Sequence, residues 1–131
     1  MSVCRLLFPL GMALLSACTF SPHDNALIVS DADDCPLHLS VGQTLTLQLS
    51  SNPTTGYRWR LAQPGAEVLR LLGPQVYTAP EDIGLVGSAG VTQWRFQAQH
   101  PGKRQLTLVY QQPWAPEVKP VETFSCTINV R

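Results

Sequence analysis

The feature that most constrains this fold is a strict alternation of apolar and polar residues in several short segments. Residues 44–50 read Thr-Leu-Thr-Leu-Gln-Leu-Ser, and an extended strand would place all the leucines on one face. The same alternation recurs in residues 57–61, 93–99, 106–110 and 124–130. A period of two residues is typical of strands with one buried face and does not suit a helix.

Further strand signals are weaker. Residues 27–30, 37–41 and 75–78 fit short strands, whereas residues 67–72 fit either a strand or one helical turn. Eleven prolines and nine glycines among 131 residues mark frequent turns. A chain of this length forms one compact domain. We therefore predict an all-β sandwich of seven to eight antiparallel strands.

The N-terminus has the pattern of an export signal. Arg5 precedes an apolar run over residues 6–15, and a run of about ten residues is too short to span a bilayer as a helix. We therefore expect residues 1–17 to be a cleaved signal peptide. Residues 15–18, Leu-Ser-Ala-Cys, resemble the bacterial lipobox, which implies that Cys18 is lipidated and becomes the mature N-terminus.

Residues 18–26 then read as a lipidated polar tether, and residues 27–131 as the folded domain. Thr19 occupies the position at which, in many Gram-negative bacteria, an Asp retains a lipoprotein at the inner membrane. This favours an outer-membrane lipoprotein that faces the periplasm, or a secreted protein if Cys18 is not lipidated. The lipid is the expected contact with a membrane.

Two cysteines remain in the folded domain, because Cys4 leaves with the signal. In an oxidising compartment, Cys35 and Cys126 are expected to form a disulfide. It would close a loop of about 90 residues, which the chain-entropy model values at about 4 to 5 kcal/mol. The alternative, a catalytic thiolate, needs a neighbouring base that the sequence does not place nearby.

Charge and histidine placement argue against several functions. Nine basic residues balance nine acidic ones, with no run of like charge longer than Asp33-Asp34, which is unlike a nucleic-acid-binding protein. His23, His38 and His100 have no metal-ligand spacing and no neighbouring nucleophile. We expect no metal, no cofactor and no enzymatic activity.

Residues 52–57 form the most distinctive segment, Asn-Pro-Thr-Thr-Gly-Tyr. The Asn52 side chain can bond forward to the backbone, Pro53 fixes one φ angle, Thr54 and Thr55 restrict χ1, and Gly56 permits a positive φ. The segment, which ends at Tyr57, is too elaborate for a minimal hairpin turn. We predict a loop that is stiff before it binds a partner.

Two further loops share an uncharged character. Residues 84–90 contain three glycines and no lysine, so they do not form a nucleotide-binding P-loop, and Leu85 and Val86 offer apolar contact. Residues 111–116 carry Trp114 between two prolines. This indole could cover the core, or it could be an exposed anchor for a partner.

In order and spacing, these segments resemble the three motifs of the chagasin-like inhibitors of papain-type cysteine peptidases. The resemblance implies an immunoglobulin-like sandwich whose loops fill the substrate cleft side by side without being cleaved. It would place residues 54–56 over the catalytic cysteine, residues 87–90 along the non-primed subsites, and Pro113 with Trp114 on the primed side. Gln112 stands where the family usually has an arginine, which puts the charged contact of that arginine in question.

The resemblance implies that residues 27–131 are a monomeric domain that inhibits papain-like cysteine peptidases reversibly and competitively. An inhibitor of another hydrolase such as lysozyme, or an envelope binding module, would share the composition and disulfide but leave the three uncharged loops unexplained. The expected peptidase-binding residues are Asn52, Pro53, Thr54, Thr55, Gly56, Tyr57, Leu85, Val86, Gly87, Ser88, Ala89, Gly90, Gln112, Pro113 and Trp114.

Overall fold

The computed structural model of the chain describes residues 25–79 and 90–131. These residues form nine strands and two short 3-10 turns. In chain order the elements are β1 (Leu27–Val29), η1 (Ala32–Asp34), β2 (Leu37–Leu39), β3 (Thr44–Ser51), η2 (Pro53–Thr55), β4 (Arg58–Gln63), β5 (Leu69–Leu71), β6 (Val76–Thr78), β7 (Gly90–Ala98), β8 (Gly102–Gln111) and β9 (Glu122–Val130).

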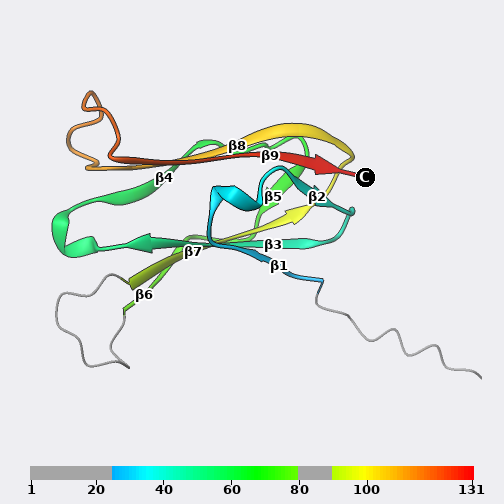
Figure 1. Cartoon of the computed structure of the whole chain (residues 1–131), viewed down its shortest axis with the longest axis horizontal. Helices are drawn as coiled ribbons and strands as arrows, with labels where there is room; N and C mark the ends of the chain where they lie inside the picture. Colours follow the sequence, from blue (N-terminus) through cyan, green and yellow to red (C-terminus); the bar gives the residue numbers. More distant parts are fainter. Residues whose placement is uncertain (1–24, 80–89) are drawn as a thin grey trace, which may run out of the picture.

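The strands form two sheets that pack face to face (Figure 1). One sheet has the order β1-β3-β7-β5, with β6 also paired to β7, and the other has the order β2-β9-β8-β4. The all-β sandwich predicted from the sequence is therefore confirmed. The five segments with clear alternation correspond to β3, β4, β7, β8 and β9.

Strand number and direction differ from the sequence-based prediction. The described part of the chain contains nine strands instead of seven or eight. Of the two alternatives for residues 67–72, the strand is the correct one, since residues 69–71 form β5. The β1–β3 and β2–β9 pairs are parallel. The chain crosses to the other sheet between β1 and β2, so no hairpin forces β1 and β3 to run in opposite directions.

The core lies between the sheets and consists of the alternating residues. Leu45, Leu47, Leu106, Leu108 and Ile128 are fully buried. Each comes from a segment whose period of two predicted an inward face, and burying such side chains stabilises the fold by about 1.5 to 3 kcal/mol each. The long alternating strands therefore supply most of the core.

A disulfide joins Cys35, just after η1, to Cys126 in β9, with a Cα–Cα distance of 5.4 Å. The Cys126 residue is 1% exposed, so the bond is shielded by the core. Because both sulfur atoms are bonded to each other, the alternative of a catalytic thiolate at either position is wrong.

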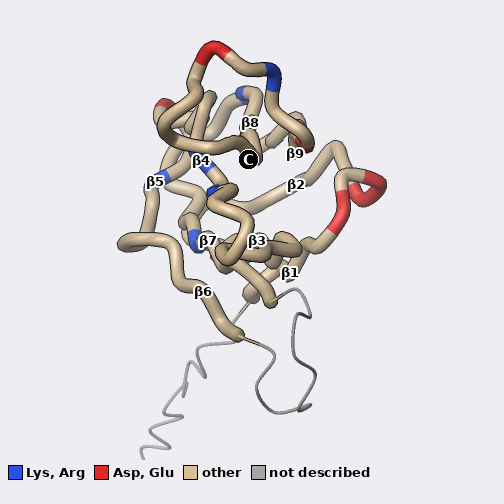
Figure 2. Tube along the Cα trace, turned by 90° about the vertical axis from the view of Figure 1, so that its left-hand side faces the viewer, with Lys and Arg blue, Asp and Glu red and all other residues tan. Residues whose placement is uncertain are grey.

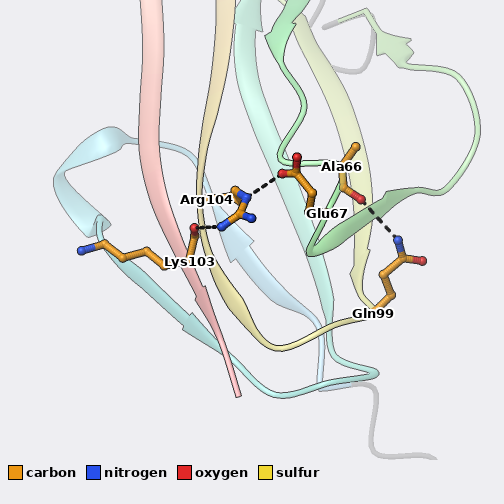
Figure 3. Close-up of polar contacts among 5 residues, drawn as sticks. All are labelled: Ala66, Glu67, Gln99, Lys103 and Arg104. Atoms are coloured by element: carbon orange, nitrogen blue, oxygen red, sulfur yellow. Dashed lines mark hydrogen bonds and ion pairs between the residues drawn. The ribbon is translucent and has the colours of Figure 1, made fainter.

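Polar contacts brace the turn between β4 and β5 (Figure 3). Arg104 Nε lies 2.6 Å from Glu67 Oε2, and the Gln99 side-chain amide donates to the Ala66 carbonyl at 3.4 Å. Both partners of the ion pair are exposed, so its contribution to stability is small. These contacts hold the connection between β4 and β5 in place.

The predicted signal peptide, Cys18 and most of the predicted tether lie outside the described residues. Within residues 25–79 and 90–131, we find no helix with the length and apolar character needed to cross a membrane.

Candidate functional site

The β3–β4 and β8–β9 connections, which carry the described part of the candidate site, lie at one end of the sandwich, on the left in Figure 1. Strand pairing brings them together, because Ser51 pairs with Gly90 and Arg58 pairs with Gln111. Residues 52–57 therefore start beside the first residue of β7 and end beside the last residue of β8. Of the predicted middle loop, only Gly90 lies within the described residues; Leu85, Val86, Gly87, Ser88 and Ala89 do not.

Residues 52–57 have the fixed geometry that their composition predicts. The Asn52 side chain accepts hydrogen bonds from the Thr54 backbone N–H at 3.2 Å and from Thr54 Oγ1 at 2.6 Å. Pro53–Thr55 form one 3-10 turn, and Gly56 closes it with φ of +82°. A side chain is strained at this φ, so glycine is the residue that suits the position.

A cluster of aromatic side chains contacts the start and the end of this loop. The Asn52 N–H donates to the Tyr110 hydroxyl at 2.8 Å, and the Trp59 indole donates to the Ser50 carbonyl at 3.0 Å. The Tyr110 ring stacks on Trp59 at a centroid distance of 4.9 Å and lies 5.4 Å from Tyr57. The alternating pattern predicted that these rings point inward, but it did not predict that Tyr110 and Trp59 hold the loop.

Trp114 packs directly on the first loop. A methyl group at Gly56 would lie 2.2 Å from Trp114 Cη2, so the indole occupies the space that any side chain there would need. Trp114 is nevertheless 68% exposed. The alternative in which Trp114 covers the core is therefore wrong, because the ring joins two loops and leaves most of its surface accessible.

Two other polar side chains bond to the backbone of the first loop. Gln112 Nε2 donates to the Thr55 carbonyl at 3.4 Å. Arg58 Nη1 donates to the Pro53 carbonyl at 3.0 Å and to the Tyr57 carbonyl at 2.8 Å. The sequence pattern predicted only that Arg58 faces outward, and the contact of its guanidinium with the loop was missed.

The structure corrects the predicted loop boundaries. Gln111 is buried and is the last residue of β8, so the third loop covers residues 112–121 instead of 111–116. Gly90 is buried at the start of β7, where a methyl group would lie 2.3 Å from the Thr78 carbonyl oxygen. Its lack of a side chain therefore serves the close approach of β6.

The third loop also exposes apolar side chains that the sequence analysis did not single out. Val118 and Val121 are each 57% exposed. They follow Trp114 in the same loop, within and at the end of the stretch 112–121. Exposed apolar side chains that lie together in one loop are typical of a surface that a partner covers.

The loop end carries little charge. Residues 52–57 contain no ionisable group other than the Tyr57 phenol, and residues 112–121 contain only Glu117 and Lys119 as charged side chains. Figure 2, which views the molecule from this end, shows mostly uncharged backbone in front. Within the described residues no group of His, Cys, Asp and Glu could hold a metal ion.

The fold and this site define a class of protein: a small disulfide-bonded sandwich that presents stiff turns of low charge side by side at one end. The sequence of residues 38–128 matches the family described as "Chagasin family peptidase inhibitor I42". The chain therefore belongs to the chagasin family of peptidase inhibitors. Membership in this family confirms two predictions: the protein is an inhibitor of papain-like cysteine peptidases, and it is not an enzyme.

Relatives agree with this assignment. The chain is 24% identical to amoebiasin-2 of Entamoeba histolytica over 105 residues, which cover 80% of this chain and 85% of that protein. The crystal structure of the cysteine protease inhibitor EhICP2 from Entamoeba histolytica matches with a TM-score of 0.67 and 21% identity, covering 81% of this chain and 95% of that one. The structure of PbICP-C in complex with falcipain-2 matches with a TM-score of 0.53 and 19% identity, covering 81% and 98%.

Proposed function

We propose that this protein inhibits papain-like cysteine peptidases reversibly and competitively, with the loops predicted at 52–57, 84–90 and 111–116 occupying the substrate cleft. The observation that carries the proposal is the packing of Trp114 on Gly56. It joins the first and third loops into one surface, at whose tip Thr54 and Thr55 are exposed. In this arrangement residues 54–56 cover the catalytic cysteine, and Pro113 with Trp114 packs on the primed side.

Rigidity accounts for the expected affinity. Loops that are already fixed lose little conformational entropy on docking, so more of the contact energy contributes to binding. An interface of about 800 Å² per partner is ordinary for such complexes and is within reach of three adjacent loops. Ser51 pairs with Gly90, so the last residue of the predicted middle loop lies beside the start of the first loop. The structural relative PbICP-C, which is in complex with falcipain-2, supports a partner of this kind.

The test is a titration of the purified protein against active papain, with lysozyme as the comparison enzyme. We expect inhibition of papain that is relieved by dilution and by excess substrate, because the loops compete for the cleft and form no covalent bond. Lysozyme activity should not change. Full papain activity at high molar excess of the protein would refute the proposal, and inhibition of lysozyme would support the alternative hydrolase.

We also propose that the protein is exported and lipidated at Cys18, as an outer-membrane lipoprotein that faces the periplasm. The support is the apolar run over residues 6–15 followed by Leu-Ser-Ala-Cys. The mass of the native protein should equal that of residues 18–131 plus the lipid. A mass without lipid would favour the secreted form.

A further inference from the structure

Side chains outside the turn hold three carbonyl groups of the first loop. Arg58 Nη1 binds the carbonyls of Pro53 and Tyr57 at 3.0 and 2.8 Å. Gln112 Nε2 binds the carbonyl of Thr55 at 3.4 Å. The bonded carbonyls alternate along the segment, and the Pro53 carbonyl also accepts the Gly56 N–H at 3.1 Å.

These bonds oppose hydrolysis of the loop. A cysteine peptidase cleaves a peptide whose scissile carbonyl points at the oxyanion-stabilising donors and lies within reach of the nucleophile. In residues 52–57 the backbone is folded into a 3-10 turn and a left-handed glycine. Reorienting a carbonyl of Pro53, Thr55 or Tyr57 for attack requires breaking its bond to Arg58 or Gln112.

We propose that Arg58 and Gln112 are positioning residues that clamp the carbonyls of the first loop and thereby keep it from being cleaved in the peptidase cleft. This inference rests on the proposed function, because it places residues 52–57 in that cleft. It also gives Gln112 a role at the position where the family usually has an arginine. An uncharged amide suffices there, since its partner is the Thr55 carbonyl.

The clamp is tested with Arg58→Met and Gln112→Met, with Arg60→Met as the matched control. Arg60 is exposed on the same strand two residues further on, and its side chain forms no hydrogen bond in the described part of the chain. We expect Arg58→Met to weaken inhibition of papain by about tenfold, since it removes two exposed hydrogen bonds of modest net strength. Gln112→Met should weaken it by about threefold, because it removes one long bond.

The decisive measurement is the fate of the inhibitor during prolonged incubation with papain, followed by mass spectrometry. We expect the wild type and Arg60→Met to remain intact, and Arg58→Met to be cut between residues 52 and 58 as its inhibition decays. If Arg58→Met stays intact and inhibits as well as Arg60→Met, the clamp does not exist. The proposal would also be wrong if papain cut Arg58→Met only at sites outside residues 52–58.

Two further measurements distinguish the clamp from a direct contact between Arg58 and the peptidase. Arg58→Lys keeps the positive charge that Arg58→Met removes, but it lacks the planar guanidinium group. If Arg58→Lys inhibits papain as well as the wild type, and if high salt weakens this inhibition, Arg58 makes a charged contact with the peptidase and is not a clamp. Hydrogen exchange of the Gly56 amide in the free protein should accelerate by about tenfold in Arg58→Met and not in Arg60→Met. This readout still tests the clamp if wild-type protein fails to inhibit papain, an outcome that would refute the proposed function.

Discussion

Replacing Gly56 by alanine tests whether the first and third loops form one unit. The substitution has two separate costs. At φ of +82° a side chain is strained, which costs about 1 to 2 kcal/mol. The added methyl group would also lie 2.2 Å from Trp114 Cη2, where ordinary contact begins at 3.4 Å, so the two atoms must separate by at least 1.2 Å (3.4 minus 2.2).

Gly73→Ala provides the matched control, because Gly73 has φ of +93° and no atom within 4 Å of the added methyl group. It therefore measures backbone strain alone. We expect both variants to lose about 1 to 2 kcal/mol of unfolding free energy from strain. Only Gly56→Ala should also weaken inhibition of papain, by about tenfold or more, because it displaces an anchor of the kind that contributes about 2 kcal/mol.

The assay combines urea unfolding with inhibition constants, and it includes both glycine variants in a Trp114→Ala background. Without the indole, the two glycine substitutions should have the same effect on stability, and Gly56→Ala should have little further effect on inhibition. The reasoning fails if Gly56→Ala and Gly73→Ala behave alike with Trp114 present. It also fails if the effects of Gly56→Ala and Trp114→Ala on inhibition simply add.

Three other substitutions test separate parts of the structure. Tyr110→Phe removes the acceptor of the Asn52 N–H and should lower the unfolding free energy by about 1 to 2 kcal/mol, as measured in urea, and weaken inhibition; a variant equal to wild type in both would contradict the proposed support. Trp114→Ala should weaken inhibition by about 30-fold while stability stays nearly constant, because the ring is 68% exposed; an unchanged inhibition constant would remove Trp114 from the site. Joint replacement of Cys35 and Cys126 by alanine should cost about 3 to 5 kcal/mol in urea unfolding and leave inhibition by the folded protein intact; equal stability with and without the disulfide would refute its structural role.

The sequence predicted the buried side of the strands well because alternation depends on local geometry. Leu45, Leu47, Phe96 and Leu108 are all buried as their positions in the pattern require. Strand direction could not be obtained in this way, since the side-chain period is the same in parallel and antiparallel pairs. The parallel pairs therefore appeared only in the structure.

The candidate site was predictable where residue type dictates backbone conformation. The capping role of Asn52 and the positive φ of Gly56 follow from their chemistry. Contacts between loops do not, because they depend on how distant segments meet in space. Arg58 alternates outward like any solvent-facing residue, and only the folded turn shows that its guanidinium reaches back to two carbonyls.

The parallel pairing of β1 with β3 has a consequence for orientation. Leu27 pairs with Leu45 near the start of β3, whereas the first loop follows the end of β3, so the chain enters the domain at the end away from the loops (Figure 1). In the proposed lipoprotein, the loops would therefore lie at the end of the domain opposite the point where the lipidated N-terminal segment joins it. A peptidase could then dock without the inhibitor leaving the membrane.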